Sequence, residues 1–293
     1  MKIGLVGLGR MGAAIAQRLS EHQFEIIAWD RRDSAARACA SRGTRVVAGP
    51  RTVAAEAEII ISIITEDSGV RRVFRGDDGF LAGDVAGKLF VEMSTLQPMT
   101  SRELAPLVEA KGARLIDAPV LGTIPSVREG KLVVMAGGRA EDIERARPVL
   151  DKLARRIVPM GPVGSGHAMK LAANIGLAAY VQAIAESLAL GHKQGLALDQ
   201  MLDVLGETAT VAPWLKAKLP MLRGEPGDVS LDLRTLRKDV MSALATGAST
   251  GVGLPLSAGT LAALSAAVAH GHGDEDIAAL PKFFRECMGQ TFD

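Results

Sequence analysis

The chain has 293 residues, a net charge of +1 at neutral pH and 23% charged residues. That length allows two domains of ordinary size, each with its own core. The balanced charge argues against the basic field that nucleic-acid binding needs, so we expect a small-molecule partner and no nucleic acid.

The chain has two cysteines, Cys39 and Cys287, which stand far apart without a CxxC or Cys/His spacing. The sequence therefore predicts neither a disulfide framework nor a metal site. The opening stretch IGLVGLG is too short and too rich in glycine for a signal peptide. No stretch reaches the roughly 18 uninterrupted apolar residues of a membrane span. We expect a cytoplasmic protein with no membrane partner.

The first half alternates short apolar runs with segments of helical periodicity. Continuous apolar strands separated by amphipathic helices indicate a mainly parallel sheet with helices on both faces. The predicted strands are residues 2–7, 25–30, 45–47, 59–64, 89–92, 114–117, 132–136 and 157–160. The predicted helices include residues 11–20, 101–111 and 141–153.

The second half has a different character from the first. From His167 onward, β-branched runs give way to sequence rich in Ala, Leu and Met with helical spacing. We place the domain boundary at Val163, which gives an α/β domain at 1–163 and an all-α domain at 164–293. Breaks near Gly195, at 223–228 and at 250–255 divide the second domain into roughly four helical blocks.

The stretch GLVGLGRMG, residues 4–12, has a GxGxxG arrangement where the first predicted strand ends and a helix begins. Gly7 permits a tight turn, Gly9 lets the backbone approach a pyrophosphate, and Gly12 allows close packing of helix on strand. A plain structural turn is the alternative interpretation. The position of the motif favours a dinucleotide site of the Rossmann type, formed by Gly7, Leu8, Gly9, Arg10, Met11 and Gly12.

Asp30 ends the second predicted strand, close to the expected offset from the glycines. Its carboxylate can accept hydrogen bonds from the adenosine ribose, which favours NAD over NADP because a 2′-phosphate would face a negative charge. Arg31 and Arg32 point the other way, since a guanidinium can pair with that phosphate. The sequence predicts NAD or NADP, with NAD slightly favoured.

The segment GSGHAMKLAAN, residues 164–174, opens the longest predicted helix with two polar residues, Lys170 and Asn174. Their spacing of four places them on one helix face, one turn apart. A lysine that extends toward solvent and a locally packed asparagine would be the plain structural explanation. A cation is disfavoured near the positive end of a helix, however, which favours a functional lysine. His167 is expected to be a solvated or capping residue.

Five motifs in the order GLVGLGRMG, VEMSTLQP, DAPVLG, GPVGSGHAMKLAAN and LRKDV cover nearly the whole chain. Together they resemble the β-hydroxyacid dehydrogenase family, which includes 3-hydroxyisobutyrate dehydrogenases and semialdehyde reductases. The resemblance implies a Rossmann domain followed by a helical domain for substrate binding and oligomerisation. It also implies a homodimer or homotetramer.

The resemblance assigns roles to individual positions. It makes Lys170 the catalytic residue and Asn174 a residue that orients the substrate. Hydride passes between the nicotinamide and the substrate carbon while Lys170 acts as general acid, or as general base in the oxidative direction. Asp30 and Arg31 match the adenosine-ribose position, and the remaining implied cofactor contacts are Ile64, Thr65, Ser94, Thr95 and Lys238.

The substrate loop departs from the family pattern. Members usually read DAPVSGG, whereas this chain has Leu121, Gly122 and Thr123 after Val120. The serine hydroxyl that would hold a substrate carboxylate is missing, while the Gly122 amide remains and Thr123 can supply a hydroxyl. Losing one hydrogen bond to a carboxylate costs roughly 1.5–3 kcal/mol, enough to change the substrate. Leu121 as a plain packing residue is the alternative.

Two other functions fit parts of the pattern. An imine reductase has the same fold, and Leu121 suits a substrate without a carboxylate, but the resemblance implies that such enzymes usually lack a lysine at position 170. A silent dinucleotide-binding module would keep the glycine loop without needing Lys170, Asn174 and Lys238 together. The sequence therefore favours an NAD(P)-dependent oxidoreductase that acts on a small hydroxy acid or semialdehyde.

Overall fold

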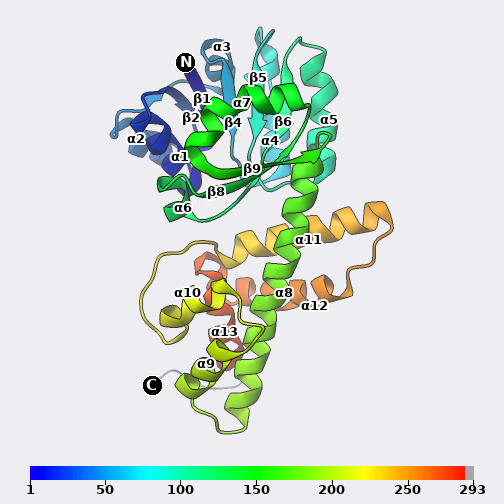
Figure 1. Ribbon diagram of the computed structural model, residues 1–293. Helices are drawn as coiled ribbons and strands as arrows, with labels where there is room; N and C mark the ends of the chain where they lie inside the picture. The colour runs from blue at the N-terminus through cyan, green and yellow to red at the C-terminus, as the bar shows by residue number, and fades with distance from the viewer. Residues whose placement is uncertain (288–293) are drawn as a thin grey trace. The chain divides into compact units, whose positions relative to one another are not determined.

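A computed structural model describes residues 1–287 (Figure 1). Its contacts divide the chain into unit 1, Met1–Ala172, and unit 2, Ala173–Asp293. The division falls inside the long helix α8 (Ser165–Lys193), because the first turns of that helix form hydrogen bonds with unit 1. The predicted boundary at 163/164 lies just before the same helix.

Unit 1 contains one mainly parallel sheet, which confirms the predicted α/β class. Its strand order is β3-β2-β1-β4-β5-β6-β8-β7, with β9 beside β8. β8 runs antiparallel to both β6 and β7, and parallel to β9. The strands are β1 (Lys2–Val6), β2 (Glu25–Trp29), β3 (Arg45–Val46), β4 (Ile59–Ser62), β5 (Leu89–Glu92), β6 (Arg114–Asp117), β7 (Val120–Leu121), β8 (Leu132–Gly137) and β9 (Ala154–Gly161).

Helices cover both faces of this sheet, as its doubly buried apolar strands require (Figure 1). One hydrophobic core lies under α1 and α7, and the other under α3, α4 and α5. The helical elements of unit 1, apart from the start of α8, are α1 (Arg10–Glu21), α2 (Asp33–Ala40), α3 (Pro50–Glu56), α4 (Asp67–Arg75), η1 (Phe80–Ala82), α5 (Pro98–Glu109), α6 (Ile124–Arg128) and α7 (Ala140–Leu153).

Unit 2 is helical, as predicted. Gly251 ends α11 in the left-handed conformation, and Pro255 starts α12, so the break near residue 250 follows from ordinary capping chemistry. The described elements after α8 are α9 (Leu198–Glu207), α10 (Pro213–Leu222), α11 (Leu233–Thr250), α12 (Pro255–Ala269), η2 (His272–Asp274), η3 (Ile277–Ala279) and α13 (Leu280–Cys287).

Helix α8 is long and apolar enough to cross a membrane, by length and composition alone. These criteria are weak support for a membrane segment, because the central helix of a folded domain meets them too. In this chain the helix carries Lys170 and Asn174, whose side chains form hydrogen bonds with other parts of the protein.

The pairing of the strands sets where the functional loops emerge. β1, β4, β5 and β6 are neighbours and run parallel, so their carboxyl ends lie at one edge of the sheet. In open α/β sheets, ligands bind outside this edge, at the point where the strand order reverses. Here the order reverses between β1 and β4.

Candidate functional site

The glycine loop joins β1 to α1 at the carboxyl edge of the sheet. Gly7 has a φ of +98°, and a Cβ there would collide with the Ile63 carbonyl oxygen. A Cβ on Gly12 would collide with the Gly7 carbonyl oxygen. Both glycines are therefore required by close backbone approach, which agrees with the roles predicted from the motif.

Gly9 leaves room for a ligand. A Cβ at this position would meet only the Arg32 guanidinium, at 3.5 Å. Gly9 is the N-cap of α1, and no side chain of the described residues accepts a hydrogen bond at that cap. The amino end of α1 thus has the open approach and the backbone amides that suit a dinucleotide pyrophosphate.

Asp30 is tied to the glycine loop. Its carboxylate accepts the Leu8 amide at 2.6 Å and the Arg32 amide at 2.7 Å. The Arg32 guanidinium lies 3.2 Å from the same carboxylate. Burial raises the pKa of Asp30, but the hydrogen bonds from Arg32 and Leu8 outweigh burial and hold the pKa below its usual value. Asp30 is therefore a fixed negative charge beside the loop.

The loops after β4 and β5 are linked through Ser94. The Ile64 amide donates to Ser94 Oγ at 2.7 Å, and the Ser94 amide donates to Glu92 Oε1 at 2.9 Å. The predicted backbone contact at Ile64 is thus engaged within the protein through its amide. Ser94 is buried, Ile64 and Thr95 are half-buried and Thr65 is exposed, so Thr65 is the most accessible of the predicted contacts in these loops.

Glu92 lies under these loops with no exposed surface. It pairs in register with Ser62 and Asp117, the last residues of the two neighbouring strands. Burial raises the pKa of Glu92 to about 7, against the lowering effect of hydrogen bonds from Ser62 and Ser94. The sequence reasoning assigned no role to Glu92, although an acid ending an apolar strand is a visible signal.

The substrate loop contains the residues that differ from the family pattern in sequence. Leu121 remains 36% exposed. Gly122 has a φ of +137°, and a Cβ there would lie 2.6 Å from Leu132 Cδ2. Thr123 caps α6 and forms a capping box with Ser126, whose Oγ accepts the Thr123 amide at 3.2 Å. The Thr123 hydroxyl is therefore part of this cap, at 3.4 Å from Ser126 Oγ.

Lys170 lies at the same edge of the sheet. It is half-buried near the start of α8, and its Nζ donates to the Val120 carbonyl oxygen at 2.9 Å. Val120 follows the carboxyl end of β6, which is parallel to β5, β4 and β1. The topology thus brings the lysine to the edge that carries the glycine loop, a relation that the residue pattern alone did not establish.

Two predicted residues and one further acid form a group in unit 2. Asn174 Nδ2 donates to Asp239 Oδ2 at 2.6 Å, and Lys238 Nζ lies 2.6 Å from Asp239 Oδ1. Asn174 and Asp239 are buried. Asp239 follows Lys238 in the LRKDV motif, and the sequence predicts no role for it. Its bond to Asn174 shows that Asp239 holds the amide of the predicted substrate-orienting residue.

The expectation that His167 is solvated or capping is wrong. The residue is fully buried, and its Nδ1 lies 3.1 Å from Ser101 Oγ and 3.6 Å from Asp117 Oδ2. Its amide donates to Asp117, so the cap of this helix comes from another strand. The error arose because the sequence does not show that α8 begins inside unit 1.

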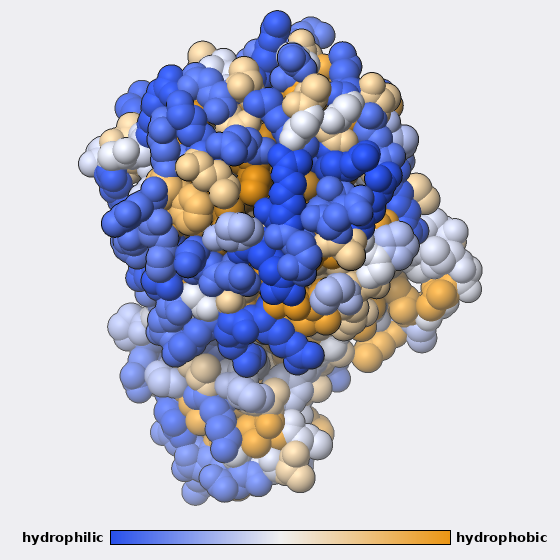
Figure 2. Space-filling view, turned by 45° about the horizontal axis from the view of Figure 1, so that its top comes forward, coloured by the Kyte–Doolittle hydropathy of each residue, from blue (hydrophilic) through white to orange (hydrophobic). Residues whose placement is uncertain are grey.

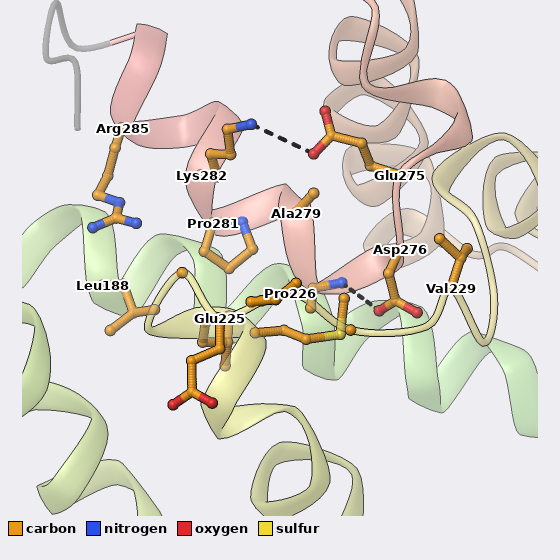
Figure 3. A pocket seen from close by; sticks show the side chains of 15 residues that line it. Leu188, Glu225, Pro226, Val229, Glu275, Asp276, Ala279, Pro281, Lys282 and Arg285 are labelled. Carbon is orange, nitrogen blue, oxygen red and sulfur yellow. Dashed lines mark hydrogen bonds and ion pairs between the residues drawn. The ribbon is translucent and has the colours of Figure 1, made fainter.

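A pocket of about 510 Å³ lies elsewhere in unit 2 (Figure 3). Apolar residues from α8, α10 and η3 line it, together with Lys282, which pairs with Glu275 at 3.5 Å, and Asp276, which accepts the Ala278 amide at 3.0 Å. It contains none of the predicted site residues, so we do not assign the active site to it.

Comparisons with known proteins bear on the same residues. Residues 2–161 match the family model described as the NAD binding domain of 6-phosphogluconate dehydrogenase. Residues 164–284 match the one described as NAD-binding of NADP-dependent 3-hydroxyisobutyrate dehydrogenase. The two models meet near the start of α8.

Three proteins illustrate the similarity over the full length. The chain is 30% identical to glyoxylate/succinic semialdehyde reductase 1 of Arabidopsis thaliana, over 98% of this chain and 100% of the relative. It is 32% identical to 3-hydroxyisobutyrate dehydrogenase of Pseudomonas aeruginosa, over 97% and 98%. The solved structure of Mycobacterium tuberculosis 3-hydroxyisobutyrate dehydrogenase with L-serine matches with a TM-score of 0.84 and 29% identity, over 97% and 99%.

The buried Glu92 makes stability depend on pH. Because folding raises its pKa from 4.5 to about 7, the unfolded chain ionises first as pH rises, and the free energy of unfolding falls over that interval. Glu92→Gln removes this titration. Thermal unfolding should show the variant gaining stability relative to the wild type between about pH 5 and pH 8. A control variant of the exposed Glu225, Glu225→Gln, should show no such gain. A pH-independent difference for Glu92→Gln would contradict the assignment.

Proposed function

The chain belongs to the β-hydroxyacid dehydrogenase family, and on that premise we propose that Lys170 is the general acid and base of its reaction. The protein is an NAD(P)-dependent oxidoreductase that acts on the CH–OH group of a small hydroxy acid or on the matching semialdehyde. The observation that carries the proposal is the position of the Lys170 ammonium at the carboxyl edge of the sheet, on the Val120 carbonyl.

When bound, the nicotinamide cofactor supplies or accepts the hydride. In reduction, Lys170 donates a proton to the oxygen that gains negative charge as the carbonyl is reduced. Before the proton moves, its positive charge stabilises that oxygen. In oxidation the same amine takes the proton of the substrate hydroxyl. The hydrogen bond to the Val120 carbonyl oxygen fixes the direction of the Nζ at the substrate loop.

Asn174 is proposed to orient the substrate from the next turn of α8. Residues four apart in a helix share one face, so Asn174 follows Lys170 on that face. Its Nδ2 donates to the buried Asp239, which fixes the rotamer of the amide. The amide oxygen can then accept a hydrogen bond from a substrate hydroxyl, and the second N–H of Nδ2 can donate to a substrate carbonyl. Lys238, held on the other oxygen of Asp239, stays a predicted cofactor contact.

We propose NAD as the preferred cofactor. Asp30 is anchored by the Leu8 amide and by Arg32, which keeps a carboxylate where the adenosine ribose is expected. A 2′-phosphate would add two negative charges beside it. Arg32 already pairs with Asp30, so its guanidinium is partly neutralised, and only the exposed Arg31 argues for NADP.

Leu121, in the loop beside Lys170, is proposed to restrict the range of substrates that the enzyme accepts. The loop offers an exposed leucine side chain next to the Val120 carbonyl that holds the lysine. The Thr123 hydroxyl is part of the α6 cap, so it does not replace the serine of the family pattern. We therefore expect the substrate to present an apolar or uncharged group to this loop rather than a carboxylate.

Oligomerisation through unit 2 is proposed from its exposed apolar side chains. Helix α12 has no charged residue along its length, yet Leu256 is 62% exposed, and Val252 just before it is 56% exposed. Figure 2 shows apolar atoms at the surface at its right-hand edge, where the hairpin of α11 and α12 projects. Apolar surface of this kind marks an interaction site. A homodimer or homotetramer would cover it.

A cytoplasmic location is proposed as well. Its support is chemical: Cys39 and Cys287 are both free thiols, and Cys287 is exposed. An exposed thiol persists more readily in a reducing compartment.

Replacing Lys170 tests the proposed chemistry. Lys170→Met keeps an unbranched side chain that is one atom shorter, and it removes the proton and the charge. Turnover should fall by about 10²- to 10⁴-fold, the usual worth of a positioned general acid. Dinucleotide affinity, measured by fluorescence titration, should stay within about twofold. Lys193→Met at the far end of α8 is the control and should keep wild-type turnover. Turnover that survives in Lys170→Met would refute the role.

Replacing Asp30 tests the cofactor preference. The wild type should bind NADH more tightly than NADPH by roughly tenfold, equal to about 1.4 kcal/mol. Asp30→Ala should abolish this preference, because it removes both the ribose acceptor and the charge facing the phosphate. Asp33→Ala, at an exposed site three residues on, should leave the preference intact. Tighter binding of NADPH by the wild type would be inconsistent with the proposal.

Replacing Leu121 tests the substrate loop. Leu121→Ser should raise kcat/KM for short aldehydes that carry a carboxylate, such as glyoxylate and succinic semialdehyde. One regained hydrogen bond to a charged group corresponds to roughly 10- to 100-fold. The matched control is Leu107→Ser, since Leu107 is 40% exposed on α5. A substrate profile unchanged by Leu121→Ser would show that the leucine only packs.

The mass in solution tests oligomerisation. Light scattering should give about two or four times the monomer mass of 30.7 kDa at micromolar concentration. Leu256→Asp should shift the distribution toward smaller species, because it places a charge on the apolar face of α12. A wild-type protein that remains monomeric throughout would exclude the proposed interface.

A further inference from the structure

The Asp117 side chain is fully buried, and it bonds to the start of α8 rather than to solvent. Its Oδ1 accepts the Gly164 amide at 2.6 Å, and its Oδ2 accepts the His167 amide at 2.8 Å. A carboxylate at this end of a helix satisfies amides that the helix itself cannot, and it interacts favourably with the helix dipole. The cap comes from the last residue of β6, far away in sequence.

Backbone segments pack closely around the Asp117 carboxylate. A Cβ on Gly137 would collide with Asp117 Oδ1, and a Cβ on Gly166 would lie 2.9 Å from Asp117 Oδ2. Glycine at both positions lets the end of β8 and the first turn of α8 reach the carboxylate directly. The side chain therefore has little freedom to move, and the helix start is held at a defined distance from the strand.

A second contact joins the same two segments. Val120, three residues after Asp117, accepts the hydrogen bond of Lys170 Nζ through its carbonyl. The strand end and the substrate loop thus hold α8 at its amino end through Asp117 and one turn later through the lysine. If the helix start moved, the Lys170 ammonium would move with it.

We propose that Asp117 is a positioning residue, which fixes the amino end of α8 and thereby places the Lys170 ammonium at the substrate loop. The inference rests on the proposed role of Lys170. Asp117 itself touches neither substrate nor cofactor in this proposal. Its carboxylate acts through the amides of Gly164 and His167, and its effect should therefore appear in the chemical step and not in dinucleotide binding.

The protonation state of Asp117 depends on pH and on the groups around the carboxyl group. The titratable or charged side chains around it are Glu92 from β5, His167 from α8 and, against Gly164, Arg102 from α5. Burial raises the pKa of Asp117 to about 6, although the amides of Gly164 and His167 oppose the shift. Below that pH the carboxyl group carries a proton and loses one acceptor for the helix amides. Above it the charged cap is complete.

Asp117→Asn is the direct test. The amide keeps one acceptor oxygen, but its NH2 faces a backbone amide that also donates. We expect kcat to fall about 10- to 100-fold, since a displacement of about 1 Å costs that much, while the Kd for the dinucleotide changes less than about twofold. The fall in wild-type kcat below about pH 6 should disappear in the variant. An acid limb that persists with the same midpoint would overturn the proposal.

Asp142→Asn is the matched control. Asp142 is also buried in unit 1, and burial likewise raises its pKa, but it lies in the first turn of α7. This variant should keep wild-type kcat and the acid limb. Asp117→Asn with only a lowered melting temperature and normal kcat for each folded molecule would show that the carboxylate is merely structural.

Hydrogen exchange provides a readout independent of activity and of any variant. In the wild type, protection of the amides at 164–168, corrected for intrinsic rates, should fall as pH drops, with the same midpoint as kcat. Protection that persists below about pH 5 while kcat falls would overturn the proposal even if Asp117→Asn does not fold. Failure of the Lys170 role would appear separately, as retained turnover in Lys170→Met with the exchange result unchanged.

Discussion

The buried carboxylate at the end of β6 is the interaction on which the candidate site depends. Asp117 joins the parallel sheet to the start of α8 through two backbone amides. The sheet fixes where the strand ends, the cap fixes where the helix begins, and the helix carries Lys170 to the Val120 carbonyl. Each position in this series follows from the one before. The lysine thereby reaches the edge of the sheet that also carries the glycine loop.

That edge concentrates buried polar groups for a physical reason. Parallel strands end together, and the loops that follow need hydrogen bonds away from water. Glu92 and Asp117 provide acceptors for these loops from neighbouring strand ends, where burial disfavours their charged forms. The arrangement costs stability at neutral pH, but it fixes the loops around Ser94 and the start of α8. Buried carboxyl groups with shifted pKa values are typical of functional sites.

The sequence predicted the parallel sheet, the helical second half and the glycine loop because periodicity and motif are local signals. It missed β7, which has only two residues, and α6, which depends on the Thr123 cap. It misjudged His167, because burial of that residue depends on a strand fifty residues earlier in the chain. The bond between Asn174 and Asp239 was likewise invisible, since it joins two helices. Long-range contacts thus decided the burial of His167 and the partner of Asn174, whereas β7 and α6 were too short to show a periodic pattern.

Motifs identified the candidate residues well, but their availability to a ligand required coordinates. The Ile64 amide and the Thr123 hydroxyl each have a partner inside the protein. The proposed preference for NAD rests on Asp30 and also depends on Arg32, because the Arg32 guanidinium lies 3.2 Å from the Asp30 carboxylate. Residue type thus indicated the chemistry, and three-dimensional contacts indicated which groups remain to perform it.

Chemical rescue tests the central claim, that the Lys170 ammonium delivers the proton, most directly. Turnover of Lys170→Ala would be measured with added primary amines of graded acidity and with ethanol as an uncharged molecule of similar size. The account predicts that ethylammonium restores turnover in proportion to its concentration, that the rate follows amine acidity, and that ethanol has no effect. Equal rescue by ethanol and ethylammonium, or no response to any amine, would contradict it.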